Sequence, residues 1–314
     1  MVEPSNWMSQ LPSPLHTAPL WDIAIPGSHD SMTYCLDSSS MLEPNTQPTW
    51  LKELEHILPG PINPFIMNWA TTQELTIIEQ LEAGVRYFDL RIACKPDDHN
   101  HTLYFAHGLY TTVTVEETFK DVAQWLTHHP KEVIILACST FDGLDNGDHQ
   151  KFIAQLNQLF SKKLCPYTVI PSLQLCWDQK YQVILSYDND AASGHQELWP
   201  KMDYWWANKT SASQVIEYLD NRLQSSGRDC SLFFVAGLNL TEDAAYVLEH
   251  LFSSMKEMTL KAYPDLLGWV KNQRCGQGKT CINIIASDFV GVNDFVQLVY
   301  QLNWNKLVGQ GSKR

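Results

Sequence analysis

Residues 71–92 read TTQELTIIEQLEAGVRYFDLRI, and this stretch decides the fold class. In its first half, apolar side chains recur at the three- and four-residue spacing of a helix. The spacing predicts a helix over residues 73–83, with Thr71 or Thr72 as its N-cap. Gly84 ends it, because glycine readily adopts the left-handed conformation that closes a helix. The second half alternates apolar and polar residues and predicts a strand.

The strand expected over residues 85–92 carries charge on one of its faces. Successive strand residues point to opposite sides, so Tyr87, Asp89 and Arg91 share one face while the other face is apolar. Two interpretations are open at this point. The charged face is either a structural ion pair inside the protein or the floor of an active site.

Outward from this unit, short apolar runs alternate with helical patterns. Strands are expected at residues 22–25, 85–92, 103–106, 132–138, 182–186, 204–206, 232–236 and 282–286. Helices are expected at residues 73–83, 115–128, 148–160, 211–223, 242–258 and 293–302. This alternation indicates an α/β fold with a parallel sheet, and about eight strands predict one distorted TIM-type βα barrel over residues 1–314. Residues 38–72 would form an insertion after the first strand, and the last strand would close against the first.

Composition and charge exclude several classes of protein. Hydrophobic residues make up 44% of the chain and charged residues 18%, which excludes intrinsic disorder. The net charge of −13 predicts no nucleic-acid partner, and any membrane contact is expected to be local and apolar. The longest apolar run, residues 133–138, is far shorter than the ~20 residues of a membrane span. With eight cysteines but no CxxC pair, and no secretory pattern at the start, we expect a reducing, cytoplasmic location, peripheral to membranes.

Ionisable side chains lie at the carboxyl ends of four of the expected strands: His29 with Asp30, Asp89 with Arg91, His107, and Asp288. In a barrel the carboxyl ends of the strands converge on one pocket. Two imidazoles suit a general base and a general acid, each held by a carboxylate. An arginine offers a planar fork for a phosphate. This combination is typical of phosphodiester cleavage by transphosphorylation, in which a neighbouring hydroxyl attacks the phosphorus.

Five segments are distinctive in combination: IPGSHDSMTY (25–34), the stretch at 71–92, LYFAHGLY (103–110), HPKEVIILAC (129–138) and NIIASDF (283–289). Together they resemble the phosphatidylinositol-specific phospholipases C, particularly the short eukaryotic members that consist of an X domain alone. The resemblance implies a hydrolase of lipid metabolism and signalling. It would meet phosphatidylinositol lipids at a transient membrane contact and release diacylglycerol and inositol phosphate or its 1,2-cyclic form.

The resemblance also implies roles for single residues. His29 resembles the base that takes the proton from the inositol 2-hydroxyl, and Asp288 resembles its orienting carboxylate. His107 resembles the acid that protonates the diacylglycerol oxygen. Asp89 would be the partner of His107, and Asp30 would lie close to the leaving group.

Arg91 matches the phosphate-binding arginine of the bacterial, metal-independent enzymes. The calcium-dependent signalling enzymes instead have an Asn at the position of Asp30 and a Glu-x-Asp where this chain has Asp89-Leu-Arg91. They also have a Glu after the fourth strand, where this chain has Ser139-Thr140. A cation of the protein thus stands at the calcium position, so no metal, calcium included, and no other cofactor is expected.

Substrate contacts are less well defined. Bacterial members carry a Lys and an Arg that contact the substrate. This chain has Ser139 or Thr140 in place of the Lys and Tyr187 in place of the Arg. The aromatic stretch at 204–208 adds Trp206 and Asn208, which either bind the inositol ring or fill the barrel. The preferred headgroup stays open.

Two other functions are kept as alternatives. A glycerophosphodiester phosphodiesterase is also a barrel with two histidines, but its His-Arg-Gly start is missing here. A non-catalytic inositide-binding module would keep the pocket without turnover. The apolar loop at 61–67 is either a rim that touches the membrane or a cap over the barrel.

Overall fold

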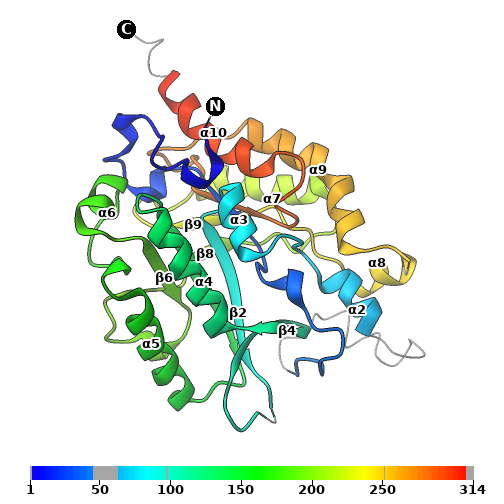
Figure 1. The fold of residues 1–314 in the computed structure, drawn as a ribbon. Helices are drawn as coiled ribbons and strands as arrows, with labels where there is room; N and C mark the ends of the chain where they lie inside the picture. Colours follow the sequence, from blue (N-terminus) through cyan, green and yellow to red (C-terminus); the bar gives the residue numbers. More distant parts are fainter. Residues whose placement is uncertain (1, 45–62, 97, 251, 309–314) are drawn as a thin grey trace.

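Eight parallel strands curl into a barrel-like sheet at the centre of the computed structural model, which describes residues 2–44, 63–96, 98–250 and 252–308 (Figure 1). The strand order is β7-β6-β5-β2-β1-β10-β9-β8. Their bounds are β1 Ile25–Ser28, β2 Tyr87–Cys94, β5 Ile134–Asp142, β6 Val183–Tyr187, β7 Leu198–Trp199, β8 Asp203–Trp205, β9 Phe234–Gly237 and β10 Ile284–Ser287. The predicted α/β barrel is confirmed, and β10 pairs with β1 in parallel, as expected for the last and first strands.

The ring of strands is open at one seam. The hydrogen-bonded order of the described strands ends at β7 on one side and β8 on the other, so these two neighbours are not joined by a ladder. Both strands are short, and Pro200, which follows β7 directly, has no N–H to donate to a ladder. The barrel is therefore open at this seam.

A hairpin extends the sheet beyond the barrel. β3 (Leu103–His107) and β4 (Leu109–Thr114) are antiparallel, and β3 pairs with the end of β2. Gly108 makes the tight turn between them with a positive φ of 72°. Residues 103–106 were predicted as a barrel strand and are instead part of this hairpin, while the short β7 was not predicted.

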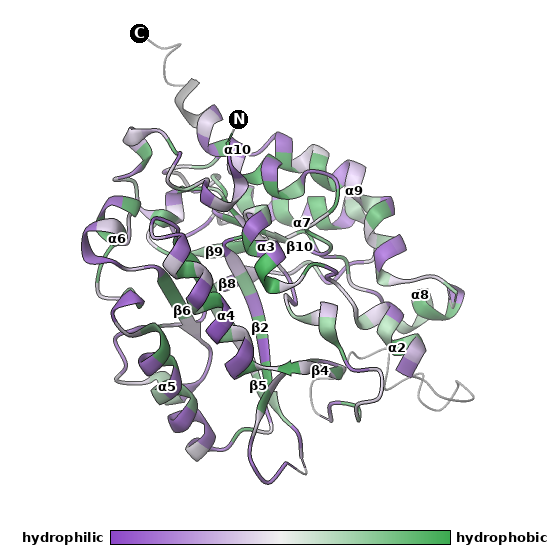
Figure 2. Cartoon of the chain, viewed as in Figure 1, coloured by the Kyte–Doolittle hydropathy of each residue, from purple (hydrophilic) through white to green (hydrophobic). Residues whose placement is uncertain are grey.

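Helices cover the outside of the sheet, and in Figure 2 α5 and α9 alternate between hydrophilic and hydrophobic colours along their length. The α-helices are α2 Asn63–Ala70, α3 Ile77–Ala83, α4 Val115–His128, α5 Asn146–Phe160, α6 Leu173–Gln179, α7 Ala212–Ser225, α8 Ala244–Glu249, α9 Met255–Lys271 and α10 Phe295–Val308. Short 3-10 helices lie at Pro4–Asn6, Ser13–Leu15, Leu20–Asp22, Thr33–Cys35, Ser161–Lys163 and Asp190–Ala192. Among the described helices, none combines the length and apolarity needed to cross a bilayer.

Capping residues explain where two predicted helices differ from the structure. α3 begins at Ile77 because Thr76 and Glu79 form a capping box, which leaves residues 73–75 outside the helix. The helix predicted over 242–258 is two helices, because the hydroxyl of Ser254 accepts from the backbone N–H of Glu257 and starts α9.

Parts of the insertion expected at 38–72 lie at residues 45–62, outside the described residues. Residues 63–70 of it form α2, in which Ile66 and Trp69 are buried. Of the two interpretations for the apolar loop at 61–67, its described part therefore supports a cap. The first strand of the barrel is anchored at its other end by a buried ion pair, in which Arg228 Nη2 lies 2.5 Å from Asp22 Oδ1.

Candidate active site

A cavity of about 660 Å³ opens at the carboxyl ends of the strands. Its lining includes His29, Asp30, Trp69, Thr72, Tyr87, Asp89, Arg91, His107, Ser139, Asp188, Lys201, Asp203, Tyr204, Trp206, Asn208, Asn239, Thr241 and Glu242. Strand β2 turns its Tyr87, Asp89 and Arg91 face into this space. Of the two interpretations of that face, the floor of a site is the one that fits.

The segment after β1 is held in an unusual backbone conformation. Asp30 has a φ of 42°, in the left-handed region that residues other than glycine rarely adopt. Gln73 fixes this turn from the loop before α3: its amide nitrogen donates to the carbonyl of His29 at 2.9 Å and to that of Ser287 at 3.0 Å. Such strain persists where the surroundings hold it in place, and it is concentrated at functional sites.

His29 forms a dyad with Asp288. Its Nδ1 lies 2.7 Å from Asp288 Oδ1, across the pairing of β1 with β10. A carboxylate accepts only, so Nδ1 carries the hydrogen and Nε2 is left facing the cavity. Burial lowers the pKa of His29, but the carboxylates of Asp30 and Asp288 outweigh this effect and raise the pKa to about 9, against an opposing effect of Arg91.

Asp30 is the centre of the charge network. Its carboxylate is paired with Arg91 Nε, and its Oδ2 lies 3.3 Å from His29 Nε2 and 3.4 Å from His107 Nε2. Burial raises the pKa of Asp30, but Arg91 and the two histidines hold it below its usual value. The partner of His107 is therefore Asp30. The prediction that Asp89 would fill this role is wrong, because the hairpin carries His107 past the end of β2 towards the β1 turn.

His107 is also held by α2, the helix that forms the cap over the barrel (the α2 cap). Its Nδ1 lies 2.8 Å from the carbonyl oxygen of Ala70, the last residue of α2. Because a carbonyl only accepts, Nδ1 carries the hydrogen and Nε2 faces Asp30 and the cavity. Both histidines are thus oriented by a bond at Nδ1 and present Nε2 to the same space.

Asp89 and Ser139 support the arginine. The hydroxyl of Ser139 donates to Asp89 Oδ1 at 2.5 Å, and the other carboxylate oxygen lies 3.7 Å from Arg91 Nη2. Between Leu90 and Arg91 the pairing of β2 with β5 shifts register, a bulge that changes the direction in which a side chain points. Ser139, predicted as a substrate contact, lines the cavity and is bound to this carboxylate.

Of the other predicted substrate contacts, two line the cavity and one does not. Trp206 and Asn208 line the cavity; Trp206 is half exposed, and its indole donates to Thr241 Oγ1 at 2.7 Å. Tyr187 does not face the cavity, because its hydroxyl bonds His149 of α5 at 2.7 Å and its ring packs on Phe141. The prediction that Tyr187 contacts the substrate is therefore wrong: its two neighbours along the chain, Ser186 and Asp188, line the cavity instead.

Several lining residues were not predicted. The ring of Tyr204 lies 6.0 Å from that of His29 between centroids, and its hydroxyl donates to Asn239 Oδ1 at 2.9 Å. The aromatic stretch at 204–208 was a signal for Tyr204. No local pattern marks Asn239 or Lys201, because both lie in loops that only the fold brings to the cavity.

The sequence of this chain is similar to that of a known protein family. Residues 65–175 match the sequence model of the phosphatidylinositol-specific phospholipase C X domain. Over 300 residues the chain is 50% identical to PI-PLC X domain-containing protein 1 of Danio rerio, with 95% of this chain and 96% of that protein covered. The human protein 1 is 43% identical, with 95% and 92% covered. The chain belongs to the PI-PLC X domain-containing protein family.

Solved structures agree with this family at the level of the fold. A phosphatidylinositol-specific phospholipase C from Staphylococcus aureus superposes with a TM-score of 0.68 at 18% identity, covering 96% of this chain and 98% of that one. The enzyme from Listeria monocytogenes gives 0.66 at 17% identity, with 96% and 99% covered. The barrel of this PI-PLC X domain protein is thus shared with the bacterial enzymes.

The X domain cavity offers one set of metal-ligating groups among its described residues. His29, Asp30 and Asp89 each place a ligand atom within 4.8 Å of the others. Arg91 already pairs with Asp30, so its positive charge would lie beside any cation that these three groups held. A calcium ion also takes about six to eight oxygen ligands. The set fits a fixed guanidinium better than a metal ion.

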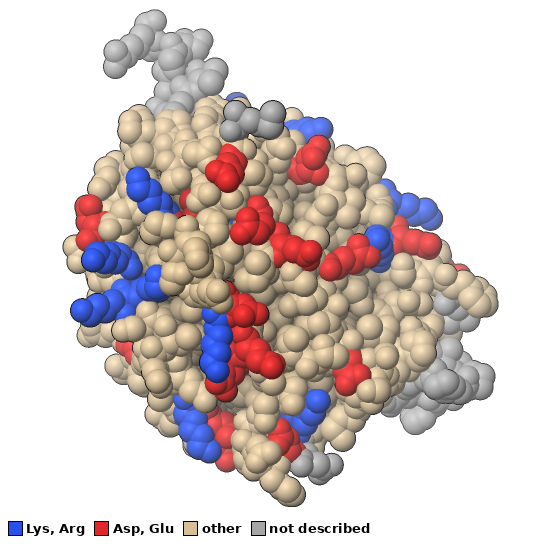
Figure 3. All heavy atoms as spheres, viewed as in Figure 1, with Lys and Arg blue, Asp and Glu red and all other residues tan. Residues whose placement is uncertain are grey.

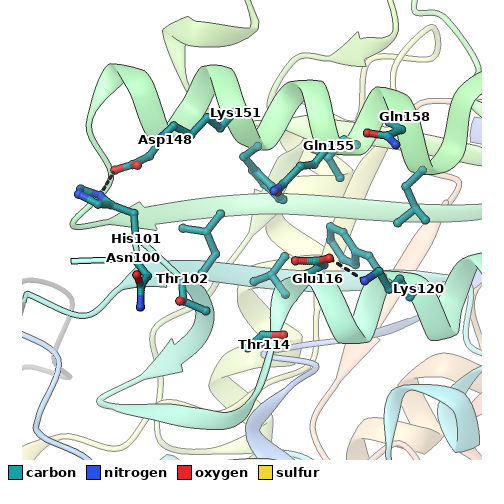
Figure 4. Close-up of a pocket in the computed structure, with 16 residues that line it drawn as sticks. Asn100, His101, Thr102, Thr114, Glu116, Lys120, Asp148, Lys151, Gln155 and Gln158 are labelled. Atoms are coloured by element: carbon teal, nitrogen blue, oxygen red, sulfur yellow. Dashed lines mark hydrogen bonds and ion pairs between the residues drawn. The ribbon is translucent and has the colours of Figure 1, made fainter. Parts of the chain in front are cut away.

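A second hollow, of about 520 Å³, lies on the outside of the X domain between α4 and α5 (Figure 4). Its polar rim is paired internally: Lys120 Nζ lies 2.6 Å from Glu116 Oε1, and His101 Nδ1 lies 2.9 Å from Asp148 Oδ2. Asp148 is also part of the capping box that starts α5. These side chains close a helix end and form surface pairs, and no arginine lies among the residues that line this hollow.

Proposed function

We propose that this protein cleaves phosphatidylinositol-type lipids by attack of the inositol 2-hydroxyl on the phosphorus. The observation that carries the proposal is the arrangement of two histidine–carboxylate pairs, His29 with Asp288 and His107 with Asp30, beside one guanidinium. Family membership and the fold of the bacterial enzymes support the substrate class. A binding module has no need of two separately oriented proton carriers.

His29 acts as the general base. In its neutral form Nε2 accepts the proton of the 2-hydroxyl while the oxygen–phosphorus bond forms, and Asp288 stabilises the imidazolium that results. Since the pKa of His29 is raised to about 9, the neutral form is a minor one at neutral pH, and its share grows as the pH rises.

His107 and Arg91 act on the other side of the reaction. As the bond from phosphorus to the glycerol oxygen breaks, protonated His107 gives its Nε2 proton to that oxygen, and diacylglycerol leaves. Arg91 binds the non-bridging phosphate oxygens, where negative charge develops. The product is inositol 1,2-cyclic phosphate, which water opens to inositol 1-phosphate. Calcium is not required, because the guanidinium supplies the cation.

The lipid would be reached from a membrane surface by exposed apolar side chains at the mouth of the cavity. Trp206 lines it, and the segment between the lining residues Glu242 and Met255 carries Leu248 and the fully exposed Phe252. Acidic and basic side chains are interspersed on the face seen in Figure 3, and the whole chain carries a net charge of −13, so contact through apolar side chains fits better than adsorption to anionic lipid by charge.

The test is the incubation of purified protein with phosphatidylinositol in mixed micelles of uncharged detergent. We expect release of diacylglycerol and of cyclic inositol phosphate, equally in excess EGTA and in millimolar calcium, and loss of both products in the folded variant His29→Ala. A glycerol-linked phosphate product would indicate the diesterase instead. Headgroup binding without turnover would indicate the non-catalytic module.

A further inference from the structure

Beyond the catalytic groups, the cavity contains a second cation whose role the reaction does not explain. Among the described residues that line it, Lys and Arg occur at Arg91 and Lys201. Lys201 lies in the short connection across the open seam between β7 and β8. Its Nζ lies 2.7 Å from Asp188 Oδ2, in the residue that directly follows β6.

This ion pair lies in an acidic part of the cavity. Asp203 and Glu242 line the same cavity, so outside the catalytic groups its described lining carries three carboxylates and one ammonium group. Asp203 is bound from outside the cavity by Arg222, at 3.2 Å. The remaining polar lining consists of neutral groups such as Asn208, Asn239 and Thr241, which suit hydroxyls as hydrogen-bond partners.

The proposed reaction places the inositol ring near Lys201 and Asp188. The inference below rests on that proposed function. His107 serves the glycerol oxygen, so the lipid leaves on the side of the α2 cap. The ring must then lie on the other side of His29, where Tyr204 and Asn239 stand. Lys201 and Asp188 line the same cavity, next to the seam that ends at β8.

We propose that the Asp188–Lys201 pair sets the headgroup specificity, and that it selects inositol without a further phosphate on the ring. A phosphomonoester carries about −1.5 to −2 charges at neutral pH. Lys201 is largely exposed and its ammonium group has three N–H donors, so a phosphate can approach it while it stays paired, but that phosphate then lies beside the negative charge of Asp188. Like charges placed together weaken binding strongly. A hydroxyl, in contrast, hydrogen-bonds to the intact pair without separating it.

The test compares kcat/KM for phosphatidylinositol and phosphatidylinositol 4-phosphate in uncharged mixed micelles. We expect wild type to prefer the unphosphorylated lipid by at least ~10-fold, which is ~1.4 kcal/mol. Asp188→Asn keeps the shape of the side chain and frees Lys201, so the ratio should fall at least ~5-fold, mainly because the phosphorylated lipid is cleaved faster. Asp190→Asn is the matched control: it makes the same charge change two residues away, at an exposed position outside the cavity, and should leave the ratio unchanged.

Binding of soluble headgroups separates this inference from the catalytic proposal. By calorimetry, wild type should bind inositol 1-phosphate more tightly than inositol 1,4-bisphosphate, and Asp188→Asn should reduce or reverse this order. That result supports the inference even if no lipid is cleaved, in which case only the catalytic proposal fails. Equal or better use of the phosphorylated lipid by wild type overturns the inference. An Asp188→Asn ratio that matches Asp190→Asn in both assays does the same.

Discussion

The dyad of His29 and Asp288 gives a prediction in which one interaction controls two measurements. Asp288→Asn keeps the size of a fully buried side chain and removes its negative charge. The 2.7 Å bond to His29 Nδ1 then joins an imidazole to a neutral amide instead of a carboxylate. The variant therefore weakens the imidazolium form of the base, both in the free enzyme and in the transition state.

The magnitude follows from the kind of bond that is lost. Hydrogen bonds to charged groups contribute about 1.5–3 kcal/mol, and one pKa unit corresponds to about 1.36 kcal/mol. The pKa of His29, raised to about 9 in the wild-type protein, should therefore fall by about 1 to 2 units. If the transition state loses the same energy, kcat should fall about 10- to 150-fold.

The pH dependence of the reaction follows from the protonation states that it needs. The base must be neutral and the acid protonated, so kcat/KM for phosphatidylinositol should be bell-shaped, with the limb that reports His29 near pH 9, the value to which its pKa is raised. In Asp288→Asn the limb that reports His29 should move to lower pH while the plateau drops. The assay is diacylglycerol release from uncharged micelles between pH 5 and pH 10.

Asp22→Asn is the matched control for this experiment. Asp22 is also a buried aspartate in an ion pair, but it binds Arg228 at the opposite end of β1. Its replacement should lower the melting temperature and leave the pH limb in place. If Asp288→Asn keeps both the wild-type limb and the wild-type plateau, His29 is not the base that the dyad was assigned to support.

The other predictions concern the acid, the phosphate clamp and the membrane contact. His107→Ala should lower kcat at least ~10²-fold, the usual size of a general acid contribution; a folded variant with near-wild-type turnover would exclude His107 as the acid. Arg91→Lys should lose ~10-fold or more in kcat with no rescue by calcium, since a point charge cannot replace the planar fork. A wild-type enzyme silent in EGTA and active with calcium would contradict that role. Trp206→Ala with Phe252→Ala should weaken sedimentation with phosphatidylcholine vesicles, and wild-type binding that rises steeply with phosphatidylserine and collapses in salt would argue against an apolar contact.

The strand ends that line the cavity could be predicted because they depend on local patterns. Alternation over residues 85–92 placed Asp89 and Arg91 on one face, and the structure turns that face into the cavity. The closeness of His29 and Asp288 follows from the pairing of the last strand with the first, in which Ser28 lies opposite Ser287. The general rule that the last strand of a barrel pairs with the first was sufficient to predict this contact.

Contacts across irregular segments could not be predicted in the same way. The pairing of His107 with Asp30 depends on a hairpin turn and on a left-handed residue, neither of which has a periodic signal. Lys201 stands in a connection across a seam that exists because two strands do not pair. Tyr187 is different, because the polar Ser186 within an apolar strand was a signal that the cavity face of β6 carries Ser186 and Asp188.

Besides binding the substrate phosphate in the proposed mechanism, the guanidinium of Arg91 acts on the pKa of His29. Asp30, Asp89 and Asp288 bring three negative charges around two histidines, and two of these carboxylates raise the pKa of His29. A substrate phosphate adds a further negative charge and favours the protonated base still more, which opposes the reaction. The guanidinium lowers the pKa of His29 while it binds the phosphate, so it offsets this effect at the step where the base must lose its proton. Because the guanidinium is covalently part of β2 and paired with Asp30, the proposed mechanism has its cation in place without a free metal ion.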